Sequence, residues 1–169
     1  MDAAALRALQ APIKDRYKSD ASAAFITLKA SGDIDGDGIA CKLETGRAMA
    51  MAGLHPLSGG SGLELCSGDM LLEALVACAG VTLKSVATAV EAGVTAGKVT
   101  AEGDLDFRGT LGIDKETPVG FKEIRLRFDV TTDAPQDKLD LLLKLTERYC
   151  VVYQTIKNGP KISVTMNRV

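Results

Sequence analysis

The sequence predicts an α+β fold in which antiparallel strands surround a long, buried central helix. Residues 68–91 form an almost wholly apolar run in the middle of the chain, as a buried core helix does. Residues 98–108 and 124–130 alternate apolar and polar side chains, which is typical of half-buried strands, and we expect them to pair as an antiparallel hairpin. Helices and strands also occur in segregated runs along the chain, a pattern that favours α+β architecture.

Length and composition limit the class of protein. The chain has 169 residues, of which 46% are hydrophobic, and its net charge is −2. These values predict a globular core and argue against nucleic acid as a partner. We expect residues 1–169 to form a single domain, with residues 1–20 as an N-terminal helical arm. The start lacks the pattern of a secretory signal, and the apolar stretch 70–83 is short for a bilayer span. A cytoplasmic protein with no membrane partner is therefore expected.

The N-terminal third is expected to contain a helix, two strands and a long loop. Apolar residues recur at helical spacing over 3–17, and Pro12 should kink or interrupt that helix. Residues 23–30 alternate as a strand does, and a second short strand is expected at 39–45. Clusters of Gly, Pro and Ser over 46–67 predict mostly loop.

The C-terminal third is expected to contain one amphipathic helix and one strand. Asp133 or Ala134 should cap the helix, with Pro135 near its first position. One stripe of this helix carries Leu139, Leu142, Leu143, Thr146 and Cys150. Residues 158–160 break the chain again, and a last strand is predicted over 161–168. That strand should bury Ile162, Val164 and Met166.

The central helix itself predicts a partner subunit. Ser67 is suited to cap its start and Gly93 to end it. A helix that is apolar all round has to be covered on all sides, and a second copy of the chain would help to cover it. Small residues would let another backbone approach closely: Ala74, Ala77, Ala79 and Gly80. We therefore expect a homodimer.

The cysteine pattern favours free thiols over structural bridges. The four cysteines are Cys41, Cys66, Cys78 and Cys150. They form no Cys-x-x-Cys pair, and His55, which reads as a surface residue, is the only histidine, so a zinc module is a poor interpretation. Cys78 is either a small buried hydrophobe or a reactive thiol with a lowered pKa. Cys66, just before the central helix, is either a third redox thiol or a loop residue without a role, and the second interpretation is favoured; Cys41 reads as structural.

Two sets of charged residues invite functional interpretations. Asp33, Asp35, Asp37, Gly38 and Glu44 satisfy the spacing of an EF-hand calcium loop, but the preceding residues alternate like a strand, so we expect a hairpin connection. Arg125, Arg127 and Asp129 share one face of a strand and are expected to form solvated cross-strand pairs. Glu73 is the lone charge within the apolar helix run and is either an exposed edge residue or a site carboxylate.

Two segments carry a resemblance to a known family. Residues 67–83 read Ser-Gly-Asp-Met-Leu-Leu-Glu-Ala-Leu-Val-Ala-Cys-Ala-Gly-Val-Thr-Leu and resemble the central helix of the OsmC/Ohr family. Residues 147–150, Glu-Arg-Tyr-Cys after a Leu-rich helix, resemble its second cysteine segment. The order of the strands matches too, so the resemblance covers nearly the whole chain. It implies an OsmC-like fold, an intertwined homodimer and thiol peroxidase activity on organic hydroperoxides, in defence against oxidative stress.

The resemblance also implies roles for individual residues. Cys78 is the peroxidatic thiol, Cys150 resolves its sulfenic acid into a disulfide, and a cellular dithiol resets the pair without cofactor or metal. The family's activating Arg is absent from the loop after Asp33, which leaves Arg47 as the candidate. In the family a Glu about ten residues before the first cysteine holds this Arg. Here Gly68 occupies that position, so Asp69 and Glu73 are the candidate carboxylates.

One further departure concerns the residue after the second cysteine. Pro usually follows that cysteine in the family, whereas Val151 does so here. Together the departures indicate a divergent branch. The alternative function is a non-catalytic OsmC-like dimer that binds a small hydrophobic ligand in an apolar pocket at the interface.

Overall fold

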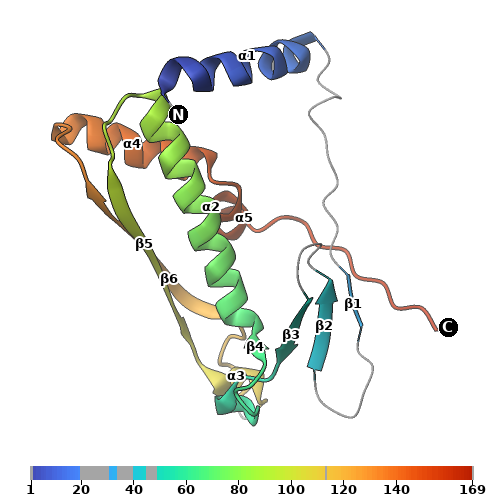
Figure 1. The fold of residues 1–169 in the computed structure, drawn as a ribbon. Coiled ribbons are helices and arrows are strands. Elements are labelled where there is room, and N and C mark those ends of the chain that lie inside the picture. Colours follow the sequence, from blue (N-terminus) through green and yellow to red (C-terminus); the bar gives the residue numbers. More distant parts are fainter. Residues whose placement is uncertain (1, 20–30, 34–39, 45–48, 113, 169) are drawn as a thin grey trace.

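The computed structural model describes residues 2–19, 31–33, 40–44, 49–112 and 114–168 (Figure 1). The elements in chain order are α1 (Ala3–Ser19), β1 (Ser31–Asp33), β2 (Ala40–Glu44), β3 (Met49–Gly53), the 3-10 turn η2 (Pro56–Ser58), β4 (Leu65–Cys66), α2 (Ser67–Ala89), β5 (Ala96–Leu105), α3 (Phe107–Thr110), β6 (Phe121–Thr131), α4 (Gln136–Tyr149) and α5 (Val151–Asn158). The chain contains both helices and strands, and all but one of the described strand pairings are antiparallel, in agreement with the α+β prediction.

The strands form two separate sheets. Strands β1, β2 and β3 pair antiparallel in sequence order, and the short β4 adds parallel to β3. Strands β5 and β6 form a long two-stranded antiparallel sheet, in which Val99 lies opposite Phe128. Helix α2 runs along β5 and also packs against α4 and α5 (Figure 1). The predicted hairpin is therefore confirmed.

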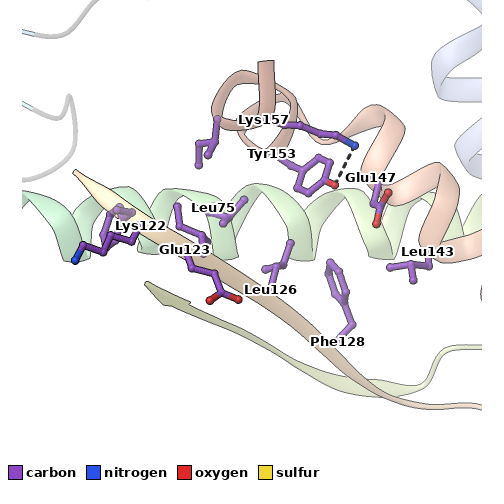
Figure 2. A pocket seen from close by; sticks show the side chains of 12 residues that line it. Leu75, Lys122, Glu123, Leu126, Phe128, Leu143, Glu147, Tyr153 and Lys157 are labelled. Atoms are coloured by element: carbon purple, nitrogen blue, oxygen red, sulfur yellow. Dashed lines mark hydrogen bonds between the residues drawn. The ribbon is translucent and has the colours of Figure 1, made fainter. Parts of the chain in front are cut away.

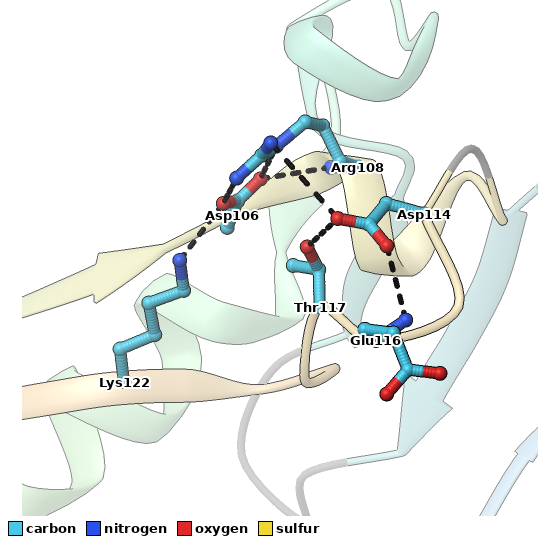
Figure 3. Close-up of polar contacts among 6 residues, drawn as sticks. All are labelled: Asp106, Arg108, Asp114, Glu116, Thr117 and Lys122. Atoms are coloured by element: carbon cyan, nitrogen blue, oxygen red, sulfur yellow. Dashed lines mark hydrogen bonds and ion pairs between the residues drawn. The ribbon is translucent and has the colours of Figure 1, made fainter.

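The strand β5 ends earlier than predicted, because Asp106 starts a helix. Its carboxylate accepts the backbone N–H of Arg108 at 3.1 Å and caps α3. The same carboxylate accepts a hydrogen bond of 2.8 Å from Lys122, which ties the start of β6 to α3 (Figure 3). Hydrogen bonds from Arg108 and Lys122 hold the pKa of Asp106 well below its usual range. This cluster therefore fixes the connection between the two strands.

The other charged residues of the hairpin form the expected solvated pairs. Arg125 donates to Asp104 across the sheet at 2.8 Å, and Arg127 lies 3.0 Å from Asp129 along the strand. All these side chains are substantially exposed, so the pairs contribute little to the free energy of folding. Because these ion pairs lie on one face of the hairpin, the other face is available to pack against the helices.

Helix α2 is covered on one face rather than on all sides, which corrects the prediction for a single chain. Its buried residues are Leu75, Ala79, Leu83, Val86 and Ala87. The opposite stripe, with Ala74, Ala77 and Val81, is exposed, and Val81 is 73% exposed. By length and composition α2 could also cross a membrane. Its contacts with β5, α4 and α5 are those of a core helix, so we keep the expectation that no membrane is involved.

The N-terminal third differs from the prediction in two places. Helix α1 continues through Pro12 without interruption, because this exposed position loses one hydrogen bond without ending the helix. Strand β3 lies within residues 46–67, which were expected to be mostly loop. The strand predicted at 39–45 is confirmed as β2, whereas the strand predicted at 23–30 lies outside the described residues.

The C-terminal third contains two helices and no final strand among its described residues. Helix α4 begins at Gln136 with Pro135 as its N-cap, two residues after Asp133 and one after Ala134, which were the expected caps. Residues 159–168 have no regular secondary structure, and their apolar side chains are exposed, with Val164 at 88%. The prediction of a buried strand over 161–168 is therefore wrong for the isolated chain, because no described strand of the same chain pairs with it.

Candidate active site

Cys78 lies in the middle of α2, on the border between its covered and its exposed face. The side chain is half-buried. Its neighbours one turn away on the exposed side are Ala74 and Val81, and Leu75 and Ala79 next to it are buried. The helix holds the backbone rigidly, so the position of the sulfur is set by one side-chain torsion. Cys78 thus combines a fixed position with partial access, as a reactive thiol requires.

Cys150 is the single residue that separates α4 from α5. Its N–H donates to the carbonyl of Thr146 at 3.0 Å and closes α4, while its own carbonyl accepts the N–H of Gln154 at 2.9 Å and opens α5. Its backbone is extended, with φ −73° and ψ 108°. The predicted helical stripe therefore breaks at this cysteine. The side chain is 1% exposed and faces α2, next to Cys78.

The first turn of α5 directs backbone N–H groups at the two sulfurs. The N–H groups at the start of a helix have no partners within it. Those of Val151 and Val152 approach the sulfur of Cys78, and those of Val152 and Tyr153 approach the sulfur of Cys150. The Cys150 side chain forms no hydrogen bond that caps α5. The positive end of the α5 dipole therefore acts on both sulfurs.

These surroundings favour the thiolate form of Cys78. Burial opposes ionisation, but the N–H of Val152, the thiol of Cys150 and the N–H of Val151 together lower the pKa of Cys78 below its ordinary value. The hydroxyl of Thr82 lies close to the same sulfur and contributes in the same direction. Cys78 is thus the better nucleophile of the pair.

Cys150 has the opposite tendency. Burial raises the pKa of Cys150, and the nearby Cys78 thiolate raises it further, against the effect of the Tyr153 N–H. Cys150 therefore stays protonated while Cys78 is ionised, and its S–H is available to the thiolate. The two cysteines have distinct chemical states although they lie side by side.

The model of the OsmC family, described as "OsmC-like protein", matches residues 60–165. This match spans more than half of the chain and contains both cysteines. The chain belongs to the OsmC-like family. No match was found for this OsmC-like protein among curated proteins.

Solved structures of the same family have the same fold. An OsmC-like protein from Mycoplasma pneumoniae superposes with a TM-score of 0.64 at 14% identity, covering 79% of this chain and 89% of that one. An organic hydroperoxide resistance protein OsmC from Legionella pneumophila has a TM-score of 0.62 at 19% identity, covering 80% and 93%. The organic hydroperoxide resistance protein OhrB of Bacillus subtilis has a TM-score of 0.52 at 16% identity, covering 79% and 93%. At these identities the likeness establishes the fold alone.

Asp69 and Glu73, two of the remaining predicted site residues, are not brought to the cysteines within one chain. Asp69 and Glu73 are exposed on α2. Asp69 precedes Cys78 by nine residues, which places it about 13 Å along the helix and on its opposite side. Glu73 precedes Cys78 by five residues and lies about 140° around the helix. Arg47 lies outside the described residues. Their roles remain predictions.

The residues that the sequence analysis missed act through groups with little sequence signal. Val151 and Val152 contribute backbone N–H groups, which no side-chain pattern marks. The feature that exposes these N–H groups is the break between two helices at Cys150. The sequence does not reveal this break, because the apolar stripe continues over residues 139–150. Thr82 could have been found from its spacing, because residues four apart are neighbours on a helix.

The other cysteines and the histidine lie away from this pair. Cys66 is half-buried and is the N-cap of α2, about three turns before Cys78. Cys41 belongs to β2, opposite Ala52 in the register. His55 accepts the N–H of Leu57 at 3.1 Å and stacks on Phe107, so it caps the turn η2. Each of these residues has a structural position that accounts for it.

The acidic loop has the surroundings of a hairpin. Asp33 ends β1 and pairs with Lys42 of β2, and Glu44 lies in the same pair of strands. An EF-hand needs helices on both sides of its loop, and here both sides are strands. Residues 34–39 lie outside the described residues. The predicted hairpin connection is therefore confirmed by its flanks.

A groove of about 510 Å³ lies between strand β6 and the helices α2, α4 and α5 (Figure 2). Leu126 and Phe128 of β6 form one wall, and Leu75 of α2 lies at its base. Leu143, Glu147, Tyr153, Ile156 and Lys157 come from α4 and α5. Glu147 precedes Cys150 by three residues and Tyr153 follows it by three, so the groove adjoins the thiol site. Strand β6 pairs with β5 on one edge, and among the described strands no other pairs with it.

Proposed function

We propose that this OsmC-like protein reduces organic hydroperoxides through Cys78 and Cys150. The observation that carries the proposal is the contact between a half-buried thiol with a lowered pKa and a second, protonated thiol at a helix N-terminus. An isolated thiol at neutral pH is only a few per cent thiolate, so stabilisation of the thiolate directly increases the reactive fraction. The organic hydroperoxide resistance proteins among the structural neighbours support the choice of substrate class.

The first step oxidises Cys78. The Cys78 thiolate attacks the terminal oxygen of the hydroperoxide, an S–O bond forms and the O–O bond breaks. The sulfur loses two electrons, and the departing alkoxide takes a proton from water to become an alcohol. The product at Cys78 is a sulfenic acid. The N–H groups of Val151 and Val152, which faced the thiolate, then face the sulfenic group.

The second step engages Cys150. Once Cys78 is a neutral sulfenic acid, the negative charge that raised the pKa of Cys150 has gone. The Cys150 sulfur attacks the Cys78 sulfur, the S–O bond breaks, and hydroxide leaves with the Cys150 proton as water. A cellular dithiol returns two electrons and two protons and regenerates both thiols. We place this cycle in the cytoplasm, where dithiol reductants are kept reduced.

Peroxide treatment followed by mass spectrometry tests this function. We expect a stoichiometric amount of an alkyl hydroperoxide to produce a peptide linked through Cys78 and Cys150, with one alcohol formed per subunit. The linked peptide should disappear when a dithiol is added. Slow oxidation of Cys78 to sulfinic acid without the link would contradict the proposal.

We also propose that the protein works as a homodimer. The exposed stripe of α2 borders Cys78, so a second copy that covers Val81 would also enclose the thiol. The unpaired C-terminal residues support the same arrangement. Ile162, Val164 and Met166 alternate with polar residues, as in a strand with one buried face, but all three are exposed in the single chain.

The groove beside β6 is suited to receive this segment from the partner. The groove is lined mainly by apolar side chains and lies against β6, whose second edge is unpaired among the described strands. An unpaired strand edge accepts an added strand through backbone hydrogen bonds. Residues 161–168 of a second copy would supply that strand, and their apolar face would fill the groove of Figure 2.

Substitutions in residues 161–168 test whether this segment adds to β6 of the partner subunit. We expect Val164→Asp to shift the protein from dimer to monomer in sedimentation experiments, because the charge would have to be buried in an apolar groove. Thr165→Asp is the matched control, since it introduces the same charge one residue later, on the other face of the segment. A dimer that survives Val164→Asp would show that these residues lie elsewhere.

The groove volume supports one alternative function, the binding of a small hydrophobic ligand without catalysis. The groove holds either the partner's segment or such a ligand. In the ligand-binding case peroxide produces no rapid Cys78–Cys150 disulfide, so the peptide experiment separates the two functions.

A further inference from the structure

Thr82 is the remaining polar side chain close to the Cys78 sulfur. It follows Cys78 by four residues, so its side chain lies over that residue on the surface of α2. Its hydroxyl donates to the Cys78 carbonyl at 2.8 Å and also lies within reach of the Cys78 sulfur. A hydroxyl has one proton and rotates freely about its C–O bond, so it can serve either acceptor but not both at once.

We propose that Thr82 is a positioning residue for the Cys78 thiolate: its hydroxyl proton serves the Cys78 carbonyl while the sulfur is protonated and turns to the sulfur when it ionises. The choice of acceptor follows from charge. A hydrogen bond to an ionised acceptor is roughly twice as strong as one between neutral groups. The carbonyl keeps its helical hydrogen bond, so it tolerates the loss of the hydroxyl.

This role would fix the sulfur as well as stabilise it. The N–H groups of Val151 and Val152 approach the thiolate from α5, and the Thr82 hydroxyl approaches it from α2 itself. Donors from two different helices restrict the side-chain torsion of Cys78 more than donors from one helix would. The role rests on the proposed function, because a positioned thiolate matters only if Cys78 reacts.

The other ionisable groups around this site have separate positions. Cys150, next to the first turn of α5, is the titratable side chain coupled to Cys78. Glu147 on α4 and Tyr153 and Lys157 on α5 line the groove of Figure 2. On α2 itself the nearest basic side chain is Lys84, which donates to the carbonyl of Val94 at 3.1 Å. A change in the pH midpoint of Cys78 alkylation after substitution of Thr82 would therefore be caused by the loss of the Thr82 hydroxyl.

The test is the pH dependence of Cys78 alkylation, which needs no peroxide. The full-length reduced protein is treated with iodoacetamide from about pH 5 to about pH 10, and the Cys78 peptide is quantified by mass spectrometry. We expect Thr82→Val to raise the midpoint by roughly 0.5 to 1 pH unit, because the thiolate loses one donor while the shape of the side chain is kept. Thr82→Ser keeps the hydroxyl and should restore the wild-type midpoint.

The chain offers a matched control on the same helix. Thr88 donates to the carbonyl of Lys84 at 2.9 Å, the same bond in a turn without cysteine, so Thr88→Val should leave the midpoint unchanged. Thr82→Ala provides a second variant should Val disturb the packing. An unchanged midpoint in Thr82→Val and Thr82→Ala would overturn the proposal, as would an equal shift in Thr88→Val. Neither outcome depends on whether the protein reduces peroxides.

Discussion

Replacing Cys78 with Ser is expected to abolish hydroperoxide reduction, a loss of at least about 1,000-fold in the rate. A serine hydroxyl stays protonated at neutral pH, and the groups that contact Cys78 among the described residues are hydrogen-bond donors, so none of them acts as a strong base for it. The measurement is the consumption of an alkyl hydroperoxide with an excess of dithiol. The fold should be retained, since the side chain is half-buried and the change in volume is small.

Two further variants test whether the loss of activity is specific to Cys78. Cys150→Ser should form one alcohol per subunit and then stop, with Cys78 held as a sulfenic acid that dimedone labels. The serine hydroxyl introduced in this variant would still donate to the thiolate, so the first step should survive. Cys66→Ser should keep full turnover, because Cys66 lies about three turns from Cys78 on the same helix. Full activity in Cys78→Ser, or its loss in Cys66→Ser, would assign the reaction to another thiol.

Val151→Pro is expected to shift the pH profile of Cys78 towards higher pH. Proline has no N–H, so the thiolate loses one of its two backbone donors from α5. The helix should persist, because Val151 is its first residue, where proline is well tolerated, and Cys150 before it already has extended backbone. Removal of a donor disfavours the charged form and raises the pKa of Cys78.

Only the deprotonated form of Cys78 reacts, so a higher pKa lowers the reaction rate at a given pH. Below the midpoint the rate of alkylation or peroxide reduction should fall by roughly 3- to 10-fold in Val151→Pro. Well above the midpoint the variant and the parent should converge. Val151→Ala keeps the N–H and serves as the control, with no shift expected. A Val151→Pro profile that superposes on the parent would mean that α5 does not stabilise the thiolate.

The fold could be predicted where the residues of one chain satisfy one another. The alternation of 98–108 and 124–130 identified the hairpin, because the two strands pair with each other and β5 packs against α2. The last strand over 161–168 has the same alternation but failed, since a strand needs a neighbour and its own chain supplies none among the described residues. Strand β3, Met49–Gly53, was missed because its small and flexible side chains mark no face.

The sequence predicted the two cysteines of the candidate site but not the groups that stabilise the Cys78 thiolate. Cys78 and Cys150 could be paired through the family resemblance, and the structure brings them together. The expected charged partners were side chains, Arg47, Asp69 and Glu73. Within the described chain the stabilising groups are instead the Cys150 thiol, the Thr82 hydroxyl and two backbone N–H groups. Every residue except proline carries a backbone N–H, and only the direction of α5 makes these two special. Sequence patterns of side chains do not record that direction.

The break between α4 and α5 at one residue makes this part of the chain sensitive to length. Each residue inserted into a helix rotates the residues beyond the insertion by about 100° and advances them by about 1.5 Å. One residue added or removed next to Cys150 would turn the N–H groups of α5 away from α2 while leaving the α2 side chains near Cys78 in place. Insertions and deletions should therefore be excluded between Thr146 and Gln154, the residues whose backbone hydrogen bonds close α4 and open α5.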